Sequence, residues 1–346
     1  MKRKSRFWLT ALRSGSCPFA ALLTAASLIA QTPSLSNPPK AERPSSASVA
    51  TNPTLKSLTE VVNVPVTVRD EYEHLISNLK REDFSLAEDG RKQLIKYFSR
   101  TRDVPLTLGV MVDTTVCQDE ALPLEKELAQ DFIHQVMAPG DQGFVQHFGS
   151  GVEFLQHLTD DVERLSGAIE RLQIEPHPTS WERIHPHGKF DRGPHHLYDA
   201  IAEAALELGK SQAGRKVLLL LTDGYEQDSR TTQKVALDVA ARAGAIIYCI
   251  NMEDPILGMV PGVGTAGRPV LMSVTEQTGG RLFWLRQPRE LPGAFNELAD
   301  ELRSQYFVGY TPTNSVHDGT FRRIRVTVQN KTYVVRARPG YYAPED

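Results

Sequence analysis

Apolar residues dominate the stretch from Leu106 to Val112, and a polar segment from Asp113 to Cys117 follows it directly. A strand that is apolar on both faces, without alternation, is typical of a parallel sheet that is covered on both sides. In an open α/β sheet, ligands bind at the loops that follow the carboxyl ends of the strands. This stretch therefore predicts both the centre of the fold and the position of a site.

Around this stretch, residues 104–304 alternate between strand patterns and helix patterns, which predicts the α/β class. We expect a doubly wound, mostly parallel, six-stranded sheet of Rossmann-like architecture. The segment 143–157 contains the turn Gly149–Gly151 and predicts a hairpin, so one edge strand should be antiparallel. The expected strands are 106–112, 143–148, 152–157, 216–222, 245–251 and 281–285, and the expected helices are 121–137, 160–172, 196–209, 231–243, 269–278 and 290–304.

The flanking regions, residues 55–103 and 305–346, carry the period-two pattern of half-buried strands. Asp89-Gly90 is a hairpin signal, and Pro65 favours an edge strand. Too few strands lie on either side to form an independent core. We expect one small all-β domain built from both chain ends, with the α/β domain inserted; the alternative is two separate β appendages. The basic residues of the last strands predict a solvated strand face; they are Arg322, Arg323, Arg325, Arg336 and Arg338.

The N-terminus predicts export from the cytoplasm. Residues 1–30 combine a basic start with the apolar run 19–30, as in a secretory signal peptide, and an uncleaved anchor is the alternative. Residues 31–54 are rich in Pro, Ser, Ala and Asn, which is typical of a disordered linker. We therefore expect a secreted or periplasmic protein.

Composition excludes several classes of protein. The apolar fraction of 40% and the charged fraction of 23% are those of a globular chain. A net charge of −3 argues against a nucleic-acid partner. Three cysteines imply no disulfide framework, and Cys249 should be a small buried apolar residue. Residues 262–267 spell G-x-G-x-x-G, but no strand directly precedes them, so we expect no nucleotide.

Several motifs together resemble a von Willebrand factor type A (VWFA) domain. They are MVDTTVC at residues 111–117, LYDAI at 197–201 and KVLLLLTDG at 216–224. The flanking phrases EDFSLAEDG, YFVGYTPTN, FRRIRVTV and RARPGYYAP are similar to secreted VWFA-related proteins common in Acidobacteria. The resemblance covers roughly residues 58–346.

The resemblance implies a metal-ion-dependent adhesion site at the carboxyl edge of the sheet. Carried over by position, its ligands would be Asp113, Thr115, Cys117, His195 and Asp223. In the family a Ser stands where this chain has Cys117, and a Thr where it has His195. A thiol and an imidazole suit Zn²⁺ better than Mg²⁺ or Mn²⁺, which prefer oxygen ligands. One divalent metal is therefore expected, either Mg²⁺ or Mn²⁺ in a degenerate adhesion site or Zn²⁺ in a mixed site.

Five of the ten histidines lie within 177–196, and the loop that holds them is either part of this site or a solvent-facing loop that binds nothing; they are His177, His185, His187, His195 and His196. Trp181 and Tyr225 should lie on the same loops, where each either anchors a partner or packs locally.

Three functions agree with these residues. The first is a protein–protein interaction module of adhesion type, without enzymatic activity, whose partner lies in the cell envelope or outside the cell. The second is a transition-metal-binding protein or a metal-dependent hydrolase that uses Asp113, Cys117, His195 and Asp223, in which a zinc-bound water acts as nucleophile. The third is a scaffold with a decayed site that serves only the assembly of an envelope complex.

Overall fold

The central strand β5 (Leu106–Asp113) is buried along its whole length. It lies inside a six-stranded sheet with the order β10-β9-β8-β5-β6-β7. The structure is a computed structural model that describes residues 61–100, 104–115, 118–175, 194–212, 214–252 and 267–345. All of these residues belong to one unit, Ser57–Asp346. Because β5 is apolar on both sides, it can only be stable with a layer of helices on each face.

The remaining strands of this sheet confirm the predicted α/β class. They are β6 (Gln142–Phe148), β7 (Val152–Thr159), β8 (Arg215–Leu221), β9 (Ala245–Met252) and β10 (Leu282–Leu285). The ladders β10–β9, β9–β8, β8–β5 and β5–β6 are parallel. The edge strand β7 is antiparallel to β6, as the Gly149–Gly151 turn predicted.

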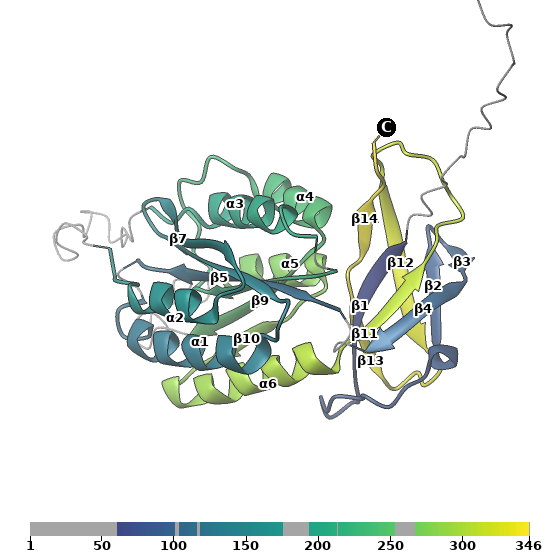
Figure 1. Ribbon diagram of the computed structural model, residues 1–346, viewed down its shortest axis with the longest axis horizontal. Helices are drawn as coiled ribbons and strands as arrows, with labels where there is room; N and C mark the ends of the chain where they lie inside the picture. Colours follow the sequence, from purple (N-terminus) through teal and green to yellow (C-terminus); the bar gives the residue numbers. More distant parts are fainter. Residues whose placement is uncertain are drawn as a thin grey trace, which may run out of the picture. The chain divides into compact units, whose positions relative to one another are not determined.

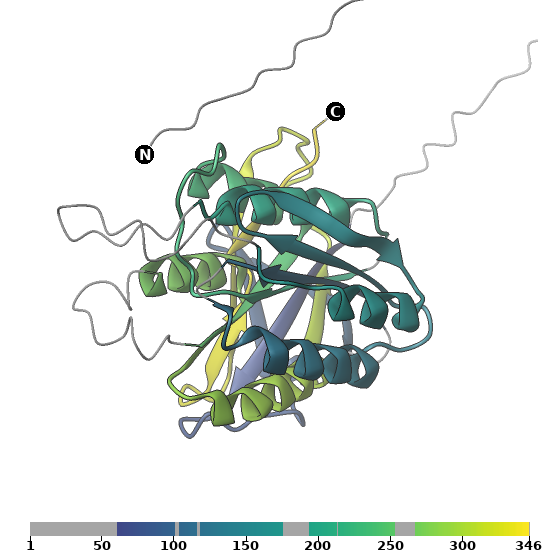
Figure 2. The ribbon, with the colours of Figure 1, turned by 90° about the vertical axis from the view of Figure 1, so that its left-hand side faces the viewer.

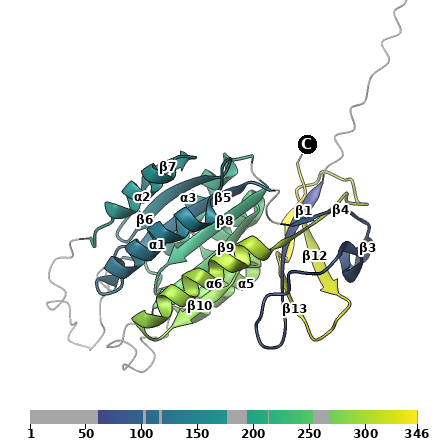
Figure 3. The same ribbon diagram turned by 60° about the horizontal axis from the view of Figure 1, so that its bottom comes forward.

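Two helical layers cover the sheet, as Figure 2 shows. One core cluster joins the sheet to α1 (Leu122–Val136), α2 (Val162–Glu170) and α6 (Leu291–Ser304). The other joins it to α3 (Leu197–Gly209), α4 (Gln233–Ala243) and α5 (Arg268–Thr278). Figure 3 shows α1 and α6 side by side on one face. Each helix thus buries its apolar stripe against the sheet, and the predicted helices are confirmed to within about two residues.

The chain ends form two further four-stranded sheets (Figure 1), with the orders β13-β1-β11-β4 and β14-β12-β2-β3. Their strands are β1 (Val62–Arg69), β2 (Phe84–Glu88), β3 (Arg91–Gln93), β4 (Ile95–Arg100), β11 (Tyr306–Tyr310), β12 (Phe321–Val328), β13 (Val334–Ala337) and β14 (Gly340–Tyr342). The N-terminal β1 pairs with β11 and β13, and β2 pairs with β12. A small all-β region made from both ends is therefore present, with one shared core.

Two details of this β region differ from expectation. The strand β1 is not an edge strand, because it lies between β13 and β11. It accommodates Pro65 because β13 pairs only with Val66–Arg69, so no ladder bond is missed on that side. Arg322 is not on the solvated face: it is 3% exposed and donates to the carbonyls of Asn314 and Val316.

The expected signal peptide and linker, residues 1–54, lie outside the described residues, as does the 262–267 motif except for Gly267. Among the residues that are described, no helix is long and apolar enough to cross a membrane. Cys249 is fully buried and unpaired, as expected for a small apolar residue.

A buried ionic network joins the β region to the α/β layer. The guanidinium of Arg69 in β1 donates to Glu301 at 2.7 Å and to Glu297 at 2.8 Å, both in α6. The hydroxyl of Tyr248 in β9 donates to the other oxygen of Glu301 at 3.0 Å. Arg69 and Glu301 are 2% and 0% exposed, so water cannot replace either partner.

Replacing Arg69 with Ala should lower the free energy of unfolding by about 3 kcal/mol, because it removes the hydrogen-bonded cation of the buried Glu301 carboxylate and leaves only Arg281, at 3.8 Å. Urea unfolding followed by circular dichroism measures this change. The matched control is Arg164→Ala, which removes an ion pair to Asp161 whose partners are 68% and 45% exposed. That change should amount to less than about 1 kcal/mol. Equal effects of the two substitutions would contradict a structural role for the network.

Candidate metal centre

The neighbouring strands β5 and β8 bring two acidic segments to one edge of the sheet. The strands are parallel and adjacent, with Val112 opposite Leu221. The residue after each of these positions therefore emerges at the carboxyl edge, Asp113 from β5 and Thr222 from β8, and Asp223 follows Thr222. This is the edge at which α/β sheets bind ligands.

The carboxylate of Asp113 is fully buried and is held by hydroxyl and amide donors. Its Oδ1 accepts from the amide of Thr115 at 3.0 Å and from the Thr115 hydroxyl at 2.7 Å. Its Oδ2 accepts from the hydroxyl of Thr222 at 2.8 Å. These bonds fix the orientation of the carboxylate, so that Oδ2 also faces His195.

His195 is placed by the loop that follows β8. Its backbone exchanges two hydrogen bonds with Gln227, at 2.9 and 3.0 Å. Its ring meets the ring of Tyr225 edge to face, with 5.0 Å between centroids. The side chain is 0% exposed, and Nδ1 lies 3.8 Å from Asp113 Oδ2. The imidazole therefore faces the acidic edge of the sheet.

The same loop holds the start of α3. The carboxylate of Glu226 accepts from the amide of Tyr198 at 3.1 Å and from the hydroxyl of Ser229 at 2.9 Å. In return, Asp199 accepts from the amides of Arg230 and Thr231 at 3.0 and 2.8 Å. These reciprocal bonds lower the pKa of Asp199 against the effect of its own burial. They tie the loop that carries Asp223 to the loop that carries His195.

Asp223 sits in a turn that only glycine neighbours permit. Its Oδ1 accepts from the amide of Tyr225 at 2.8 Å. The following residue, Gly224, has a φ of 75°, which is unfavourable for other residues. Gly267, before α5, comes so close that a Cβ there would lie 2.0 Å from the Asp223 carbonyl oxygen.

Asp113, His195 and Asp223 each offer one ligand atom, and these atoms lie within 4.8 Å of one another. Burial alone would raise the pKa of Asp113, but the nearby imidazole of His195, together with the hydrogen bonds from Thr115, holds it below its ordinary value. An ionised carboxylate is the form that ligates metals. Two carboxylates and one imidazole suit Zn²⁺ and similar transition metals, whereas Mg²⁺ prefers oxygen ligands alone.

Of the five predicted ligands, the structure brings Asp113, His195 and Asp223 together. The Thr115 hydroxyl lies at the same edge, where it donates to Asp113. Cys117 is outside the described residues, and so are Trp181 and three of the histidines, His177, His185 and His187. Of the two alternatives for Tyr225, the structure shows local packing: the ring lies against His195 and the hydroxyl donates to Gln227 at 3.1 Å.

Sequence patterns did not single out Thr222 or Glu125. Thr222 lies between the end of β8 and the predicted ligand Asp223, and its hydroxyl donates to Asp113. Glu125 lies in α1 at an apolar position of the helix, and it is 0% exposed. Neither of its carboxyl oxygens has a hydrogen-bond partner among the described residues. Burial raises the pKa of Glu125 to about 8, and the negative charge of Asp113 adds to the rise. The sequence signal that could have identified Glu125 is an acidic residue at a position of α1 where the helical period calls for an apolar one.

No family model matches the sequence, and neither does any curated protein. Similar solved structures include a von Willebrand factor type A protein from Catenulispora acidiphila, with 12% identity over 84% of this chain and 75% of that chain, and a TM-score of 0.45. Proximal thread matrix protein 1 from the mussel byssus has 15% identity over 62% of this chain and 51% of that chain, and a TM-score of 0.47.

A second structure of the mussel protein is described as having a zinc-occupied metal-ion-dependent adhesion site, with 15% identity, 60% and 48% coverage, and a TM-score of 0.46. This chain thus spans about half the length of the mussel protein structures. The six-stranded sheet between two layers of helices is the doubly wound α/β arrangement that the sequence predicted.

Replacing Glu125 with Gln should make the metal-free protein less sensitive to alkaline pH. Between the unfolded value of 4.5 and the folded value of about 8, only the folded state keeps this proton, so rising pH lowers the free energy of unfolding. We expect the wild type to lose on the order of a few kcal/mol through this group between about pH 5 and about pH 8, and the variant to lose less.

Urea unfolding with a chelator present, at a series of pH values, gives both slopes. The control is Glu127→Gln, an exposed acid on the same helix, whose slope should match that of the wild type. The buried position of Glu125 would be contradicted if the Glu125→Gln slope also matched it.

Proposed function

We propose that this chain is a metal-dependent protein–protein interaction module that acts outside the cytoplasm. The observation that carries the proposal is the convergence of Asp113, His195 and Asp223 at the ligand-binding edge of the sheet. Three protein ligands leave at least one coordination position of a divalent metal for a group from outside. A carboxylate of a partner protein would complete the coordination, as the family resemblance implies.

The donor set supports Zn²⁺ as the metal. An imidazole nitrogen is a good ligand for zinc, and carboxylate oxygens serve it equally well. His195 is also held rigidly, because its backbone pairs with Gln227 and its ring packs on Tyr225. A preorganised ligand loses little conformational entropy when the metal binds, and this favours tight binding.

Location outside the cytoplasm rests on the basic start and apolar run of residues 1–30. The hydrogen bonds of Asp113 support a binding role over a catalytic one. Both of its oxygens accept hydrogen bonds from hydroxyl groups, so it is engaged in holding the site together and is a poor general base.

Metal analysis of the full chain tests the proposal. After removal of metal and separate re-equilibration with Zn²⁺, Mn²⁺ and Mg²⁺, we expect about one Zn²⁺ per chain and weaker retention of the other two. His195→Ala and Asp223→Asn should each weaken zinc binding by at least roughly tenfold, since each removes one of three ligands.

The matched control is His196→Ala, which removes the adjacent imidazole but none of the three converging ligands. Zinc that survives His195→Ala, or that is lost equally in His196→Ala, would place the metal elsewhere. If no metal is retained at all, the interaction edge does not depend on a metal. Steady zinc-dependent hydrolysis of 4-nitrophenyl acetate by the loaded protein, abolished by His195→Ala, would replace the binding role with the hydrolase alternative.

A further inference from the structure

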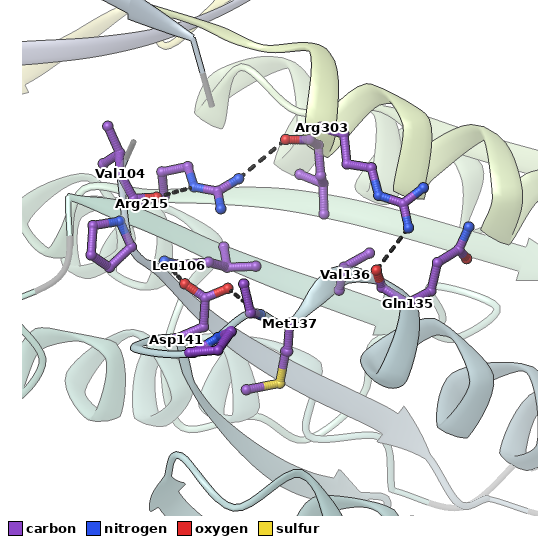
Figure 4. Close-up of a pocket in the computed structure, with 12 residues that line it drawn as sticks. Val104, Leu106, Gln135, Val136, Met137, Asp141, Arg215 and Arg303 are labelled. Atoms are coloured by element: carbon purple, nitrogen blue, oxygen red, sulfur yellow. Dashed lines mark hydrogen bonds between the residues drawn. The ribbon is translucent and has the colours of Figure 1, made fainter. Parts of the chain in front are cut away.

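A cavity of about 450 Å³ lies at the amino edge of the sheet, at the opposite end of β5 from Asp113. Its wall is formed by the start of β5, the end of α1 with the turn after it, the start of β8 and the end of α6. Figure 4 shows that its lining is divided by chemistry. Leu106, Val136 and Met137 are apolar, whereas Arg215 and Arg303 bring guanidinium groups. The volume lies within the range of small-molecule sites.

Arg215 is the unusual member of this lining, since it is a cation that is only 7% exposed. Its Nε donates to the Val104 carbonyl at 2.8 Å, and its Nη1 donates to the Leu302 carbonyl at 3.1 Å. In Figure 4 the remaining nitrogen, Nη2, carries no hydrogen bond to the other residues drawn. Burial lowers the pKa of Arg215, although the charge of Asp141 opposes this. Nη2 is not among the buried atoms that lack a partner, so this donor is open to the cavity, where water or an acceptor group of a ligand can bind it.

Asp141, the acidic residue of the lining, does not accept a hydrogen bond from Arg215. Asp141 also lines the cavity, but its Oδ1 accepts from the Leu106 amide at 2.7 Å and its Oδ2 from the Ala138 amide at 2.9 Å. No ion pair within 4.0 Å joins Asp141 to Arg215 in the described part of the chain. Both oxygens of Asp141 are therefore occupied by backbone amides at the turn between α1 and β6, and the charge of this carboxylate balances one of the two guanidinium groups in the lining.

A second arginine, Arg303, gives the lining an excess of positive charge. Arg303 in α6 donates through Nη2 to the Gln135 carbonyl at 2.7 Å. Its Nη1 is 3.8 Å from the Asp300 carboxylate, which is longer than a hydrogen bond. Both arginines bind carbonyls near the ends of helices, which is a structural role, and both keep further N–H groups for another acceptor.

We propose that this cavity is a binding site for a small organic acid, whose carboxylate meets Arg215 and Arg303 and whose apolar part lies against Val136 and Met137. A guanidinium and a carboxylate match in geometry, and the hydrogen bonds between them are charge-assisted. The apolar half of the lining excludes a small inorganic anion as the best occupant, because that half would stay uncovered. The proposal is independent of the metal centre.

Isothermal titration calorimetry with the full chain tests the proposal, with hexanoate as the probe. We expect saturable binding of hexanoate and at least roughly tenfold weaker binding of hexanol, which lacks the carboxylate, and of inorganic phosphate, which lacks the apolar tail. Hexanol that binds as tightly as hexanoate would show a purely apolar cavity. Phosphate that binds as tightly would show a general cation site. Either result overturns the proposal, and so does the absence of saturable hexanoate binding.

Variants locate the site. Arg303→Gln should weaken hexanoate binding by roughly tenfold, and Arg215→Gln should weaken it further because the buried guanidinium is lost. Ala138→Trp should block the cavity without disturbing the core, since Ala138 lines the cavity and is exposed. Arg289→Gln is the control for charge alone, because Arg289 is exposed just before α6 and does not line the cavity.

If Arg215→Gln does not fold, as judged by circular dichroism, Arg303→Gln and Ala138→Trp decide the question. Unchanged hexanoate binding in both of these variants would overturn the proposal. Equal weakening in Arg289→Gln would overturn it as well, since the effect would then follow the net charge of the protein and not the cavity.

Discussion

The complete burial of β5 is the constraint on which the rest of the α/β layer depends. A strand with no exposed face needs neighbours on both sides and helices above and below, and the chain supplies β8 and β6 as neighbours and two helical layers as cover. The same burial makes the strand a rigid axis with two chemically distinct ends. Asp113 leaves it at the carboxyl edge, and Leu106 starts it at the wall of the cavity.

Buried charge is handled in three different ways along this framework. Arg69 and Glu301 neutralise each other where the β region meets α6. Asp113 stays ionised because Thr115 and Thr222 donate hydrogen bonds to its two oxygens and the His195 imidazole lies beside it. Glu125 has no such partner among the described residues. Its pKa is raised, so the buried carboxyl group stays protonated and neutral at neutral pH. The difference between the two acids is one of local donors, because both are fully buried.

The two ends of the sheet are consequently suited to opposite kinds of ligand. At the carboxyl edge, carboxylates and an imidazole converge, which favours a cation. At the amino edge, two arginines face a cavity whose nearest acid is already occupied by backbone amides, which favours an anion. The loop from Asp223 to Thr231 links the cation edge to α3 through Glu226 and Asp199. A ligand at that edge therefore acts on a well-braced structure and not on a loose loop.

Much of the fold followed from patterns that are local in sequence. The unbroken apolar strands, the Gly149–Gly151 turn and the alternating terminal strands each predicted their element, because burial on one or two faces imposes a definite period. The place of Pro65 was predicted wrongly, since whether a proline lies on a paired stretch depends on where the distant β13 ends. Arg322 was also misplaced, because its carbonyl acceptors at Asn314 and Val316 come from a loop whose course no periodicity encodes.

For the sites, the sequence by itself indicated which ligands could gather at the carboxyl edge: the strand pattern placed Asp113 there, and the family resemblance implied His195 and Asp223. Only the tertiary structure decided that their ligand atoms lie within 4.8 Å, that Thr222 orients Asp113, and that Glu125 is buried with no hydrogen-bond partner in the described part of the chain. The cavity with Arg215 could not be found from the sequence at all. Its walls come from four separate segments, and a side chain's remaining hydrogen-bonding capacity depends on which backbone groups those segments bring to it.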